Sequence, residues 1–311
     1  MSERVPVAPF GGLPRDHPGA RAPRYSVLPV PFDLTVSYVS GTRLGPEAIL
    51  EASAHMELYD EELGCEPSDA GIETLPPPPP AGSPEEMIDR VASAVDGIAG
   101  QGRVPVTLGG EHSITLGAVR ALVERYPGLS VLQLDAHADM RDSYMDSPFN
   151  HACVARRVSE LCPVVQLGVR SLSTEEAEYL DSIAAAGAGG GGGAGLPRVV
   201  TRYAPEVLRS LSGGGGGTGG GAEGLLSGLA GDVYVTIDID VLDPSIMPST
   251  GTPEPGGLGW YDVLAVLSAV ARAARVVGFD IVELCPQPGN VAPDFLCAKL
   301  AYKMMGYINR A

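Results

Sequence analysis

The sequence predicts an α/β protein: one three-layer domain in which a central parallel sheet of about eight strands is flanked by helices. Short apolar runs alternate with helical patterns along the chain, which is typical of a parallel sheet wrapped by helices. Several apolar runs end directly in Asp or His, and open α/β sheets place their ligands at that end of the strands. The length of 311 residues suits a single domain over 1–311, and no internal repeat divides it.

Apolar runs and helical periodicity define the elements of the first half of the chain. Pro46 suits the first turn of a helix, and Pro76–Pro80 is a stiff polyproline connector. The expected elements are a strand at Ser26–Pro29, helices at Gly45–Met56 and Pro84–Ile98, a strand at Val104–Leu108, a helix at Ser113–Arg125 and a strand at Ser130–Leu134.

In the second half of the chain, apolar runs and helical patterns continue to alternate. Apolar residues occupy every second position from Val233 to Ile239, which indicates a strand. The expected elements are strands at Val164–Val169, Arg198–Val200, Val233–Ile239 and Val276–Val282, and helices at Thr174–Ala186, Ala204–Leu211, Tyr261–Ala274 and Asp294–Ile308.

Glycine is concentrated in two runs, at 187–195 and 213–224, which hold 7 and 9 of the 41 glycines. We interpret both runs as flexible loops, since glycine-rich segments behave as flexible chains. Neither run ends in Lys followed by Ser or Thr, so neither is a phosphate-binding P-loop.

Charge and cysteine usage limit the partners and the compartment. Asp and Glu number 38 against 21 Lys and Arg, a net charge of -17, which argues against nucleic-acid binding and suits a small cationic ligand. Five cysteines without C-x-x-C spacing are expected to be reduced thiols. No run reaches 18 apolar residues and no signal peptide is evident, so we expect a cytoplasmic protein that does not bind membranes.

Three groups of metal-ligand residues follow predicted strands. Asp135, His137 and Asp139 alternate with alanines after the strand Ser130–Leu134, so their side chains share one side of an extended segment. Asp238 and Asp240 share a face at the end of another strand. His112 follows a third strand, in Gly-Gly-Glu-His-Ser. A polar loop with a capping Asp is the alternative for the first group, and a structural histidine is the alternative for the last.

Together these six residues offer four carboxylates and two imidazoles, without a thiolate. They are too many for one zinc ion and suit a pair of Mn²⁺-like ions. Other sites fit less well: no EF-hand glycine or terminal Glu follows Asp240, and Ser113 lacks the G-x-S-x-G elbow of serine hydrolases. A binuclear phosphoesterase also uses Asp-x-His, but its Gly-Asn-His-Asp/Glu motif is absent.

The chain resembles the ureohydrolases (arginase, agmatinase and relatives), and agmatinases most. Five ordered motifs carry the resemblance: GGEHSIT at Gly109–Thr115, DAHAD at Asp135–Asp139, NHACVARR at Asn150–Arg157, DIDVLDPS at Asp238–Ser245 and TGTPEPGGL at Thr250–Leu258.

The resemblance implies an arginase-like fold, two Mn²⁺ ions per subunit (or Ni²⁺), and a trimer or hexamer. One ion would be held by His112, Asp135, Asp139 and Asp238, and the other by Asp135, His137, Asp238 and Asp240. Asp139 would move a proton to the leaving amine, His151 would shuttle protons, and Glu283 would pair with the guanidinium. A helix-start role for His151 and a structural ion pair for Glu283 are the alternatives.

By this resemblance, the expected reaction is hydrolysis of agmatine to putrescine and urea, a step of polyamine biosynthesis. The rival substrates are guanidinobutyrate, guanidinopropionate, arginine and guanidine, and a catalytically silent metal-binding paralogue is the non-enzyme alternative. Arg141 stands where arginases have Asn, and Asp142 or Asp146 would face a distal ammonium. Glu111 and Glu254 are expected to support the site, and Cys153 and Cys285 to pack beside it.

Overall fold

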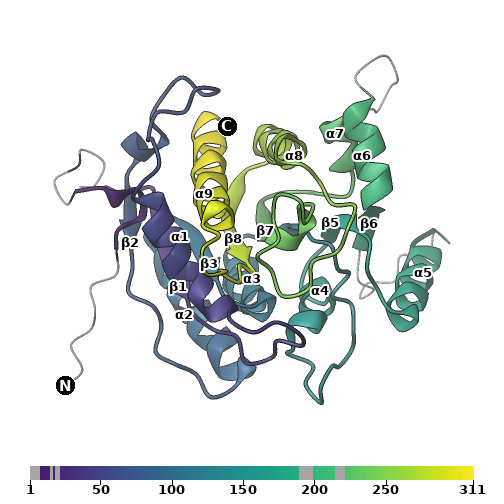
Figure 1. The fold of residues 1–311 in the computed structure, drawn as a ribbon. Coiled ribbons are helices and arrows are strands. Elements are labelled where there is room, and N and C mark those ends of the chain that lie inside the picture. Colours follow the sequence, from purple (N-terminus) through teal and green to yellow (C-terminus); the bar gives the residue numbers. More distant parts are fainter. Residues whose placement is uncertain (1–7, 15–16, 18–21, 189–198, 214–220) are drawn as a thin grey trace.

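A central sheet runs through the molecule in the order β2-β1-β3-β8-β7-β4-β5-β6 (Figure 1). The structure is a computed structural model that describes residues 8–14, 17, 22–188, 199–213 and 221–311. In these residues the sheet has eight strands, and every neighbouring pair is parallel, as the sequence predicts. The strands are β1 (Tyr25–Val30), β2 (Ile72–Thr74), β3 (Val104–Gly109), β4 (Ser130–Leu134), β5 (Val164–Val169), β6 (Val199–Tyr203), β7 (Val233–Asp238) and β8 (Val276–Val282).

Helices cover both faces of the sheet and make the domain three layers thick (Figure 1). One face packs against α1 (Gly45–Ser53), α6 (Ala204–Ser212), α7 (Ala222–Leu225), α8 (Trp260–Ala273) and α9 (Ala292–Arg310). The other face packs against α2 (Pro84–Gly100), α3 (Thr115–Arg125) and α4 (Val154–Ser159). A smaller cluster joins α5 (Thr174–Ala188) to the β5–β6 side of the sheet.

Strand residues alternate between these two cores. In β1, Tyr25 and Val27 face the core that contains α9, whereas Leu28 and Val30 face the core that contains α2. Every residue of β1, β4, β5, β7 and β8 is buried, which explains why these strands are rich in apolar residues.

The prediction omits three short elements: β2, α4 and α7, each of three to six residues. Such lengths are too short for periodicity to reveal. The strand expected at Arg198–Val200 is β6, which extends to Tyr203, while Arg198 lies outside the described residues.

The two glycine runs lie mostly outside the described residues, at 189–198 and 214–220. Their described ends are partly helical, because 187–188 close α5 and 222–224 belong to α7. At these described ends the chain is therefore helical, whereas the sequence predicts loops there.

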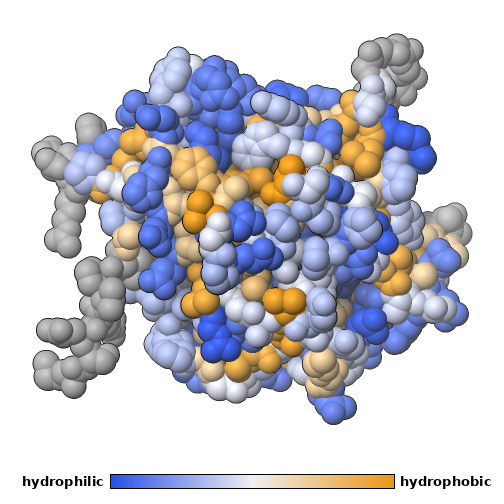
Figure 2. Space-filling view, viewed as in Figure 1, coloured by the Kyte–Doolittle hydropathy of each residue, from blue (hydrophilic) through white to orange (hydrophobic). Residues whose placement is uncertain are grey.

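The surface is mostly hydrophilic on the face that Figure 2 shows, where apolar residues are scattered among the hydrophilic ones. Of the described helices, none is both long and apolar enough to cross a membrane.

One glycine brings two loops together beside the sheet. A Cβ on Gly110 would overlap the carbonyl oxygen of Phe32, so the loop after β3 approaches the loop after β1 closely. The Gly110 N–H donates to Val30 O at 2.9 Å, and the Glu111 N–H donates to Phe32 O at 2.8 Å. This contact places Glu111 beside the segment that contains Thr35.

Candidate metal centre and pocket

Four adjacent strands, β3, β8, β7 and β4, deliver the candidate residues to one edge of the sheet. Because the strands are parallel, their carboxyl ends meet there, and open α/β sheets bind ligands at this position. His112 follows β3, and the Asp135–Asp139 segment follows β4. Asp238 is the last residue of β7, Asp240 lies two residues further on, and Glu283 follows β8. All six candidate ligands therefore come together.

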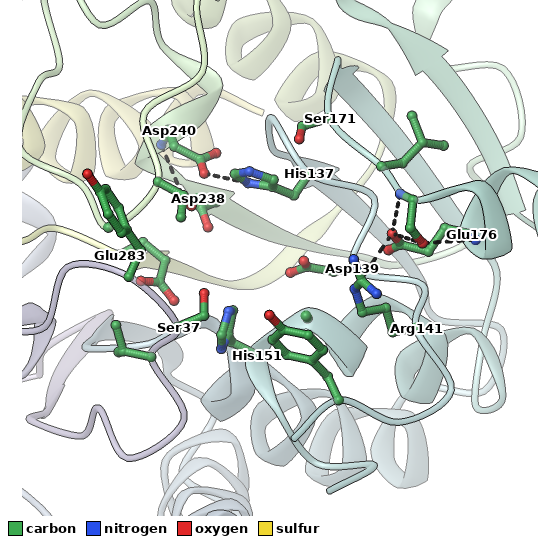
Figure 3. A pocket seen from close by; sticks show the side chains of 18 residues that line it. Ser37, His137, Asp139, Arg141, His151, Ser171, Glu176, Asp238, Asp240 and Glu283 are labelled. Atoms are coloured by element: carbon green, nitrogen blue, oxygen red, sulfur yellow. Dashed lines mark hydrogen bonds and ion pairs between the residues drawn. The ribbon is translucent and has the colours of Figure 1, made fainter. Parts of the chain in front are cut away.

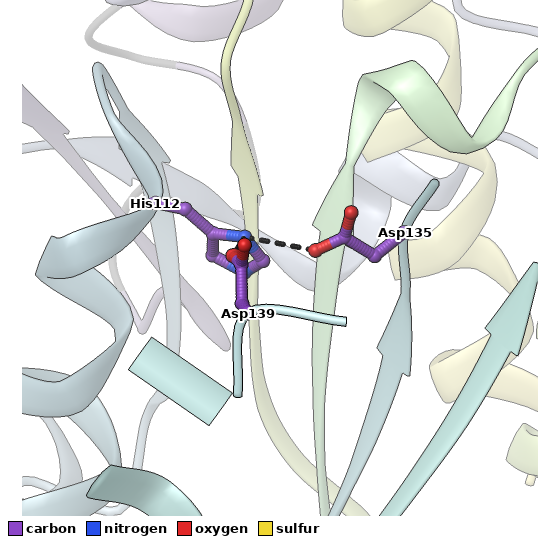
Figure 4. Close-up of side chains that lie close together, drawn as sticks. All are labelled: His112, Asp135 and Asp139. Carbon is purple, nitrogen blue, oxygen red and sulfur yellow. Dashed lines mark ion pairs between the residues drawn. The ribbon is translucent and has the colours of Figure 1, made fainter. Parts of the chain in front are cut away.

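The first group of ligand atoms surrounds His112 (Figure 4). Its Nδ1 lies 3.2 Å from Asp135 Oδ2, 3.2 Å from Asp139 Oδ2 and 3.4 Å from Asp238 Oδ2. Figure 4 shows His112, Asp135 and Asp139 pointing toward one another. All four side chains are buried, so the carboxylates are held apart from bulk water.

The second group surrounds His137 and shares Asp135 with the first. His137 Nδ1 lies 2.8 Å from Asp240 Oδ2 and 3.8 Å from Asp135 Oδ1. The Ala136 N–H donates to Asp240 Oδ1 at 2.9 Å, which ties the loop after β4 to the end of β7. Glu254 reaches 3.9 Å from His137 Nε2 on the other side of the ring. Both groups have the geometry of a metal site, and Asp135 belongs to both.

The hydrogen bonds of His112 test whether a cation fits the first group. Thr236 donates its hydroxyl hydrogen to Asp280 Oδ1 at 2.6 Å, so its oxygen accepts from His112 Nε2 at 2.9 Å. In the neutral form, which is the form that ligates a metal, the imidazole carries its hydrogen on Nε2 and directs the Nδ1 lone pair at three carboxylates. In the described residues Nδ1 has no hydrogen-bond partner. A metal ion between these groups removes the repulsion, and the donor set fits Mn²⁺-like ions.

The acids and histidines of the site shift one another's pKa values, and burial shifts them further. Burial raises the pKa of Asp135 and Asp238, and it raises the pKa of Asp139 to about 7. Burial lowers the pKa of His137, but Asp240 and Asp135 outweigh it and raise that pKa to about 11. The protein alone therefore leaves the site short of positive charge, which bound cations would supply.

Two of the acids lie on unusual backbone. Asp139 has φ 52° and Glu283 has φ 67°, in the left-handed region that residues with a side chain rarely adopt. Such conformations persist where the surrounding structure holds them, and they are often found at functional sites.

Glu283 lies between the ligand groups and the pocket. Its Oε1 accepts the His112 N–H at 2.6 Å, and burial raises its pKa. No lysine or arginine of the described segments lies within ion-pair distance of Glu283, and its side chain lines the pocket.

A pocket of about 250 Å³ opens in front of these residues (Figure 3). His137, Asp139, Asp238, Asp240 and Glu283 line its inner end, as Figure 3 shows. His151 lies on another wall, where the Tyr144 ring packs edge-on at 6.3 Å. Burial lowers the pKa of His151 to about 4, so the ring is neutral near neutral pH.

The far part of the pocket contains Glu176, which the sequence did not single out. Glu176 accepts the Met140 N–H at 2.9 Å, and its Oε2 lies 3.9 Å from Arg141 Nε. The Arg141 guanidinium also lies over the Tyr144 ring at 4.8 Å. Glu176 follows a Ser-x-x-Glu capping pattern at the start of α5, which gives no hint of a pocket residue.

Two minor expectations for neighbouring residues are resolved by the structure. Asp142 binds Arg157 at 2.7 Å instead of facing the pocket, and Asp146 is exposed and does not line it. Cys153 and Cys285 are buried and bond to the carbonyl oxygens of Ser147 and Ser40, so both pack beside the site rather than line it.

Comparison with known proteins gives one family. The sequence model of the Arginase family matches residues 23–188 and 221–306. The chain is 39% identical over 289 residues to N(1)-aminopropylagmatine ureohydrolase from Synechocystis, covering 90% of this chain and 88% of the relative. It is 34% identical over 294 residues to agmatinase from Pyrococcus horikoshii, covering 91% of each. Agmatine ureohydrolase of Thermoplasma volcanium has a similar structure, with a TM-score of 0.79, 32% identity and coverage of 93% of this chain and 90% of that one.

Proposed function

Because the chain belongs to the arginase family, whose ureohydrolases act on guanidino compounds, we propose that it hydrolyses a guanidino compound with a cationic tail. The substrate class is agmatine, giving putrescine and urea, or its N(1)-aminopropyl derivative, giving a triamine and urea. This would place the protein in polyamine biosynthesis. The observation that carries the proposal is the pair of ligand groups that share Asp135 at the bottom of an acidic pocket.

The two ligand groups would hold two ions, Mn²⁺ or Ni²⁺. His112, Asp135, Asp139 and Asp238 would hold the first, and Asp135, His137, Asp238 and Asp240 the second. Such a pair would supply an activated water at neutral pH and offset the negative charge of the carboxylates.

Three acid–base groups would serve the reaction around these ions. Glu283 uses one carboxylate oxygen for the His112 N–H, which leaves the other to pair with the planar guanidinium. Asp139, which lines the pocket 3.2 Å from His112 Nδ1, would take a proton and pass it to the leaving amine. His151, on the pocket wall, would exchange protons with solvent.

The pocket supports a cationic tail. The acids of the ligand groups and Glu283 line the pocket, and the net charge of -17 favours approach of a cation. Glu176 adds little free charge, because its two oxygens already accept hydrogen bonds from Met140 and Ser173. A carboxylate tail is the second candidate, because Arg141 is a cation in the described pocket wall. However, Arg141 already lies beside the Glu176 carboxylate and over the Tyr144 ring. These contacts partly compensate its positive charge and reduce its attraction for a carboxylate tail.

Urea release from a panel of guanidino compounds tests the substrate. Agmatine and guanidinobutyrate form a matched pair that differs in an amine or a carboxylate at the tail, and N(1)-aminopropylagmatine, guanidinopropionate, arginine and guanidine complete the panel. Each compound is assayed with Mn²⁺, with Ni²⁺ and after chelation.

We expect the highest kcat/KM with an amine-tailed compound. Preference for guanidinobutyrate would favour the second candidate, and absence of urea with every compound would indicate a silent metal-binding paralogue. By family resemblance we also propose that the protein is cytoplasmic and that it assembles into a trimer or hexamer. Light scattering on the purified protein measures the size of the assembly.

A further inference from the structure

A buried glutamate outside the ligand groups, Glu111, is connected to His151 through one threonine. The Thr35 hydroxyl donates to Glu111 Oε1 at 2.7 Å, and the Thr35 N–H donates to Glu111 Oε2 at 2.6 Å. The same Thr35 oxygen lies 3.1 Å from the backbone nitrogen of His151 and 3.2 Å from its ring Nδ1. Glu111 is fully buried and Thr35 is 9% exposed, so water does not compete for these bonds.

The hydrogens in this network can be counted. Glu111 accepts a third hydrogen bond, from the Ser113 hydroxyl at 2.6 Å, and a carboxylate with three donors is an acceptor only. The single hydroxyl hydrogen of Thr35 is thus used on Glu111. Its oxygen can only accept from His151, so the ring hydrogen must sit on Nδ1.

We propose that Glu111 and Thr35 are positioning residues that hold neutral His151 in the Nδ1–H tautomer and leave Nε2 as its one acceptor nitrogen. The catalytic consequence rests on the proposed function, because only then does Nε2 take up a proton during turnover. The tautomer itself does not depend on that function. The edge-on Tyr144 ring limits rotation of His151 from a second side.

The substitution Glu111→Gln tests the count of hydrogens without changing the shape of the side chain. The backbone N–H of Thr35 is fixed in place and can only donate, so the glutamine will orient its amide oxygen toward this N–H and accept a hydrogen bond from it. The amide NH₂ then faces the hydroxyls of Thr35 and Ser113, which must become acceptors. Thr35 will donate its hydrogen to His151 Nδ1, and the ring hydrogen will move to Nε2.

The readout is the two-bond ¹H–¹⁵N spectrum of protein labelled at its five histidines, in which the two ring nitrogens report the tautomer. His151→Asn assigns the signal. We expect the Nδ1–H pattern in the wild type and in Thr35→Ser, the Nε2–H pattern in Glu111→Gln, and a mixture in Thr35→Val. Ser113→Ala is the matched control: it removes a hydrogen bond from Glu111 but none from His151, and the tautomer will stay as in the wild type.

Turnover and metal content complete the test. In Glu111→Gln, kcat should fall by about tenfold or more, within the ~100-fold that a general acid–base group contributes, while KM and Mn²⁺ stoichiometry stay unchanged. An Nε2–H tautomer in the wild type, or an unchanged tautomer in folded Glu111→Gln, would overturn the proposal. If no guanidino compound yields urea but the tautomers behave as expected, the proposed function fails and the positioning role stands.

Discussion

Replacement of Thr236 by valine should weaken binding of the metal ion that His112 would hold and spare binding of the one that His137 would hold. Valine matches threonine in shape but removes the hydroxyl that connects His112 Nε2, at 2.9 Å, to Asp280. Loss of such an outer partner typically lowers metal affinity by about 10- to 100-fold, or about 1.4–2.8 kcal/mol. Thr236 is buried, so no water can take the place of the hydroxyl.

Isothermal titration of the metal-free protein with Mn²⁺ measures the two affinities. Tyr234→Phe is the matched control, because it also removes a buried hydroxyl from Asp280, at 2.7 Å, but leaves Thr236 and His112 connected. Each variant should lose stability of about 1.5–3 kcal/mol for a hydrogen bond to a charged group. The reasoning is refuted if Thr236→Val binds both ions as the wild type does, or if Tyr234→Phe weakens metal binding equally.

Four further outcomes are expected. His151→Asn should lower kcat by about 100-fold while both ions remain, as kinetics and metal analysis will show; loss of metal would contradict it. Asp238→Asn should reduce metal content below two per chain and abolish urea release. Mn²⁺ added to chelated protein at ~100 times its Kd should stabilise it by about 2.7 kcal/mol for each ion bound, as urea melts will show; an unchanged midpoint would speak against a folded-state site. Iodoacetamide at pH 8 should label half-buried Cys65 first, since burial raises the pKa of Cys153 to about 11; mass spectrometry identifies the site.

The fold and the ligand groups were accessible to sequence reasoning for a physical reason. The sheet is parallel and covered on both faces, so its strands are short segments rich in apolar residues that stand out between the helical patterns. The ligands follow directly on β3, β4 and β7, and parallel strands bring their carboxyl ends to one edge.

The supporting residues could not be predicted, because their roles depend on which loops meet in space. Thr35 and His151 are 116 residues apart, and nothing local in either segment indicates their contact. The connection between Asp280 in β8 and His112 after β3 was equally hidden, because it passes through Thr236 in β7. Asp142 was placed wrongly because its partner, Arg157, belongs to the short helix α4, which periodicity did not reveal.

The left-handed backbone at Asp139 and Glu283 has a consequence for laboratory evolution of this protein. Glycine at either position would relieve roughly 1 kcal/mol or more of conformational cost. A library screened for heat resistance without metal should therefore enrich glycine at 139, whereas at 283 the loss of the acceptor for the His112 N–H offsets the gain. The Asp139→Gly survivors would be more stable proteins without urea release. Selection for thermostability must be paired with an activity screen, and these two codons are best kept fixed.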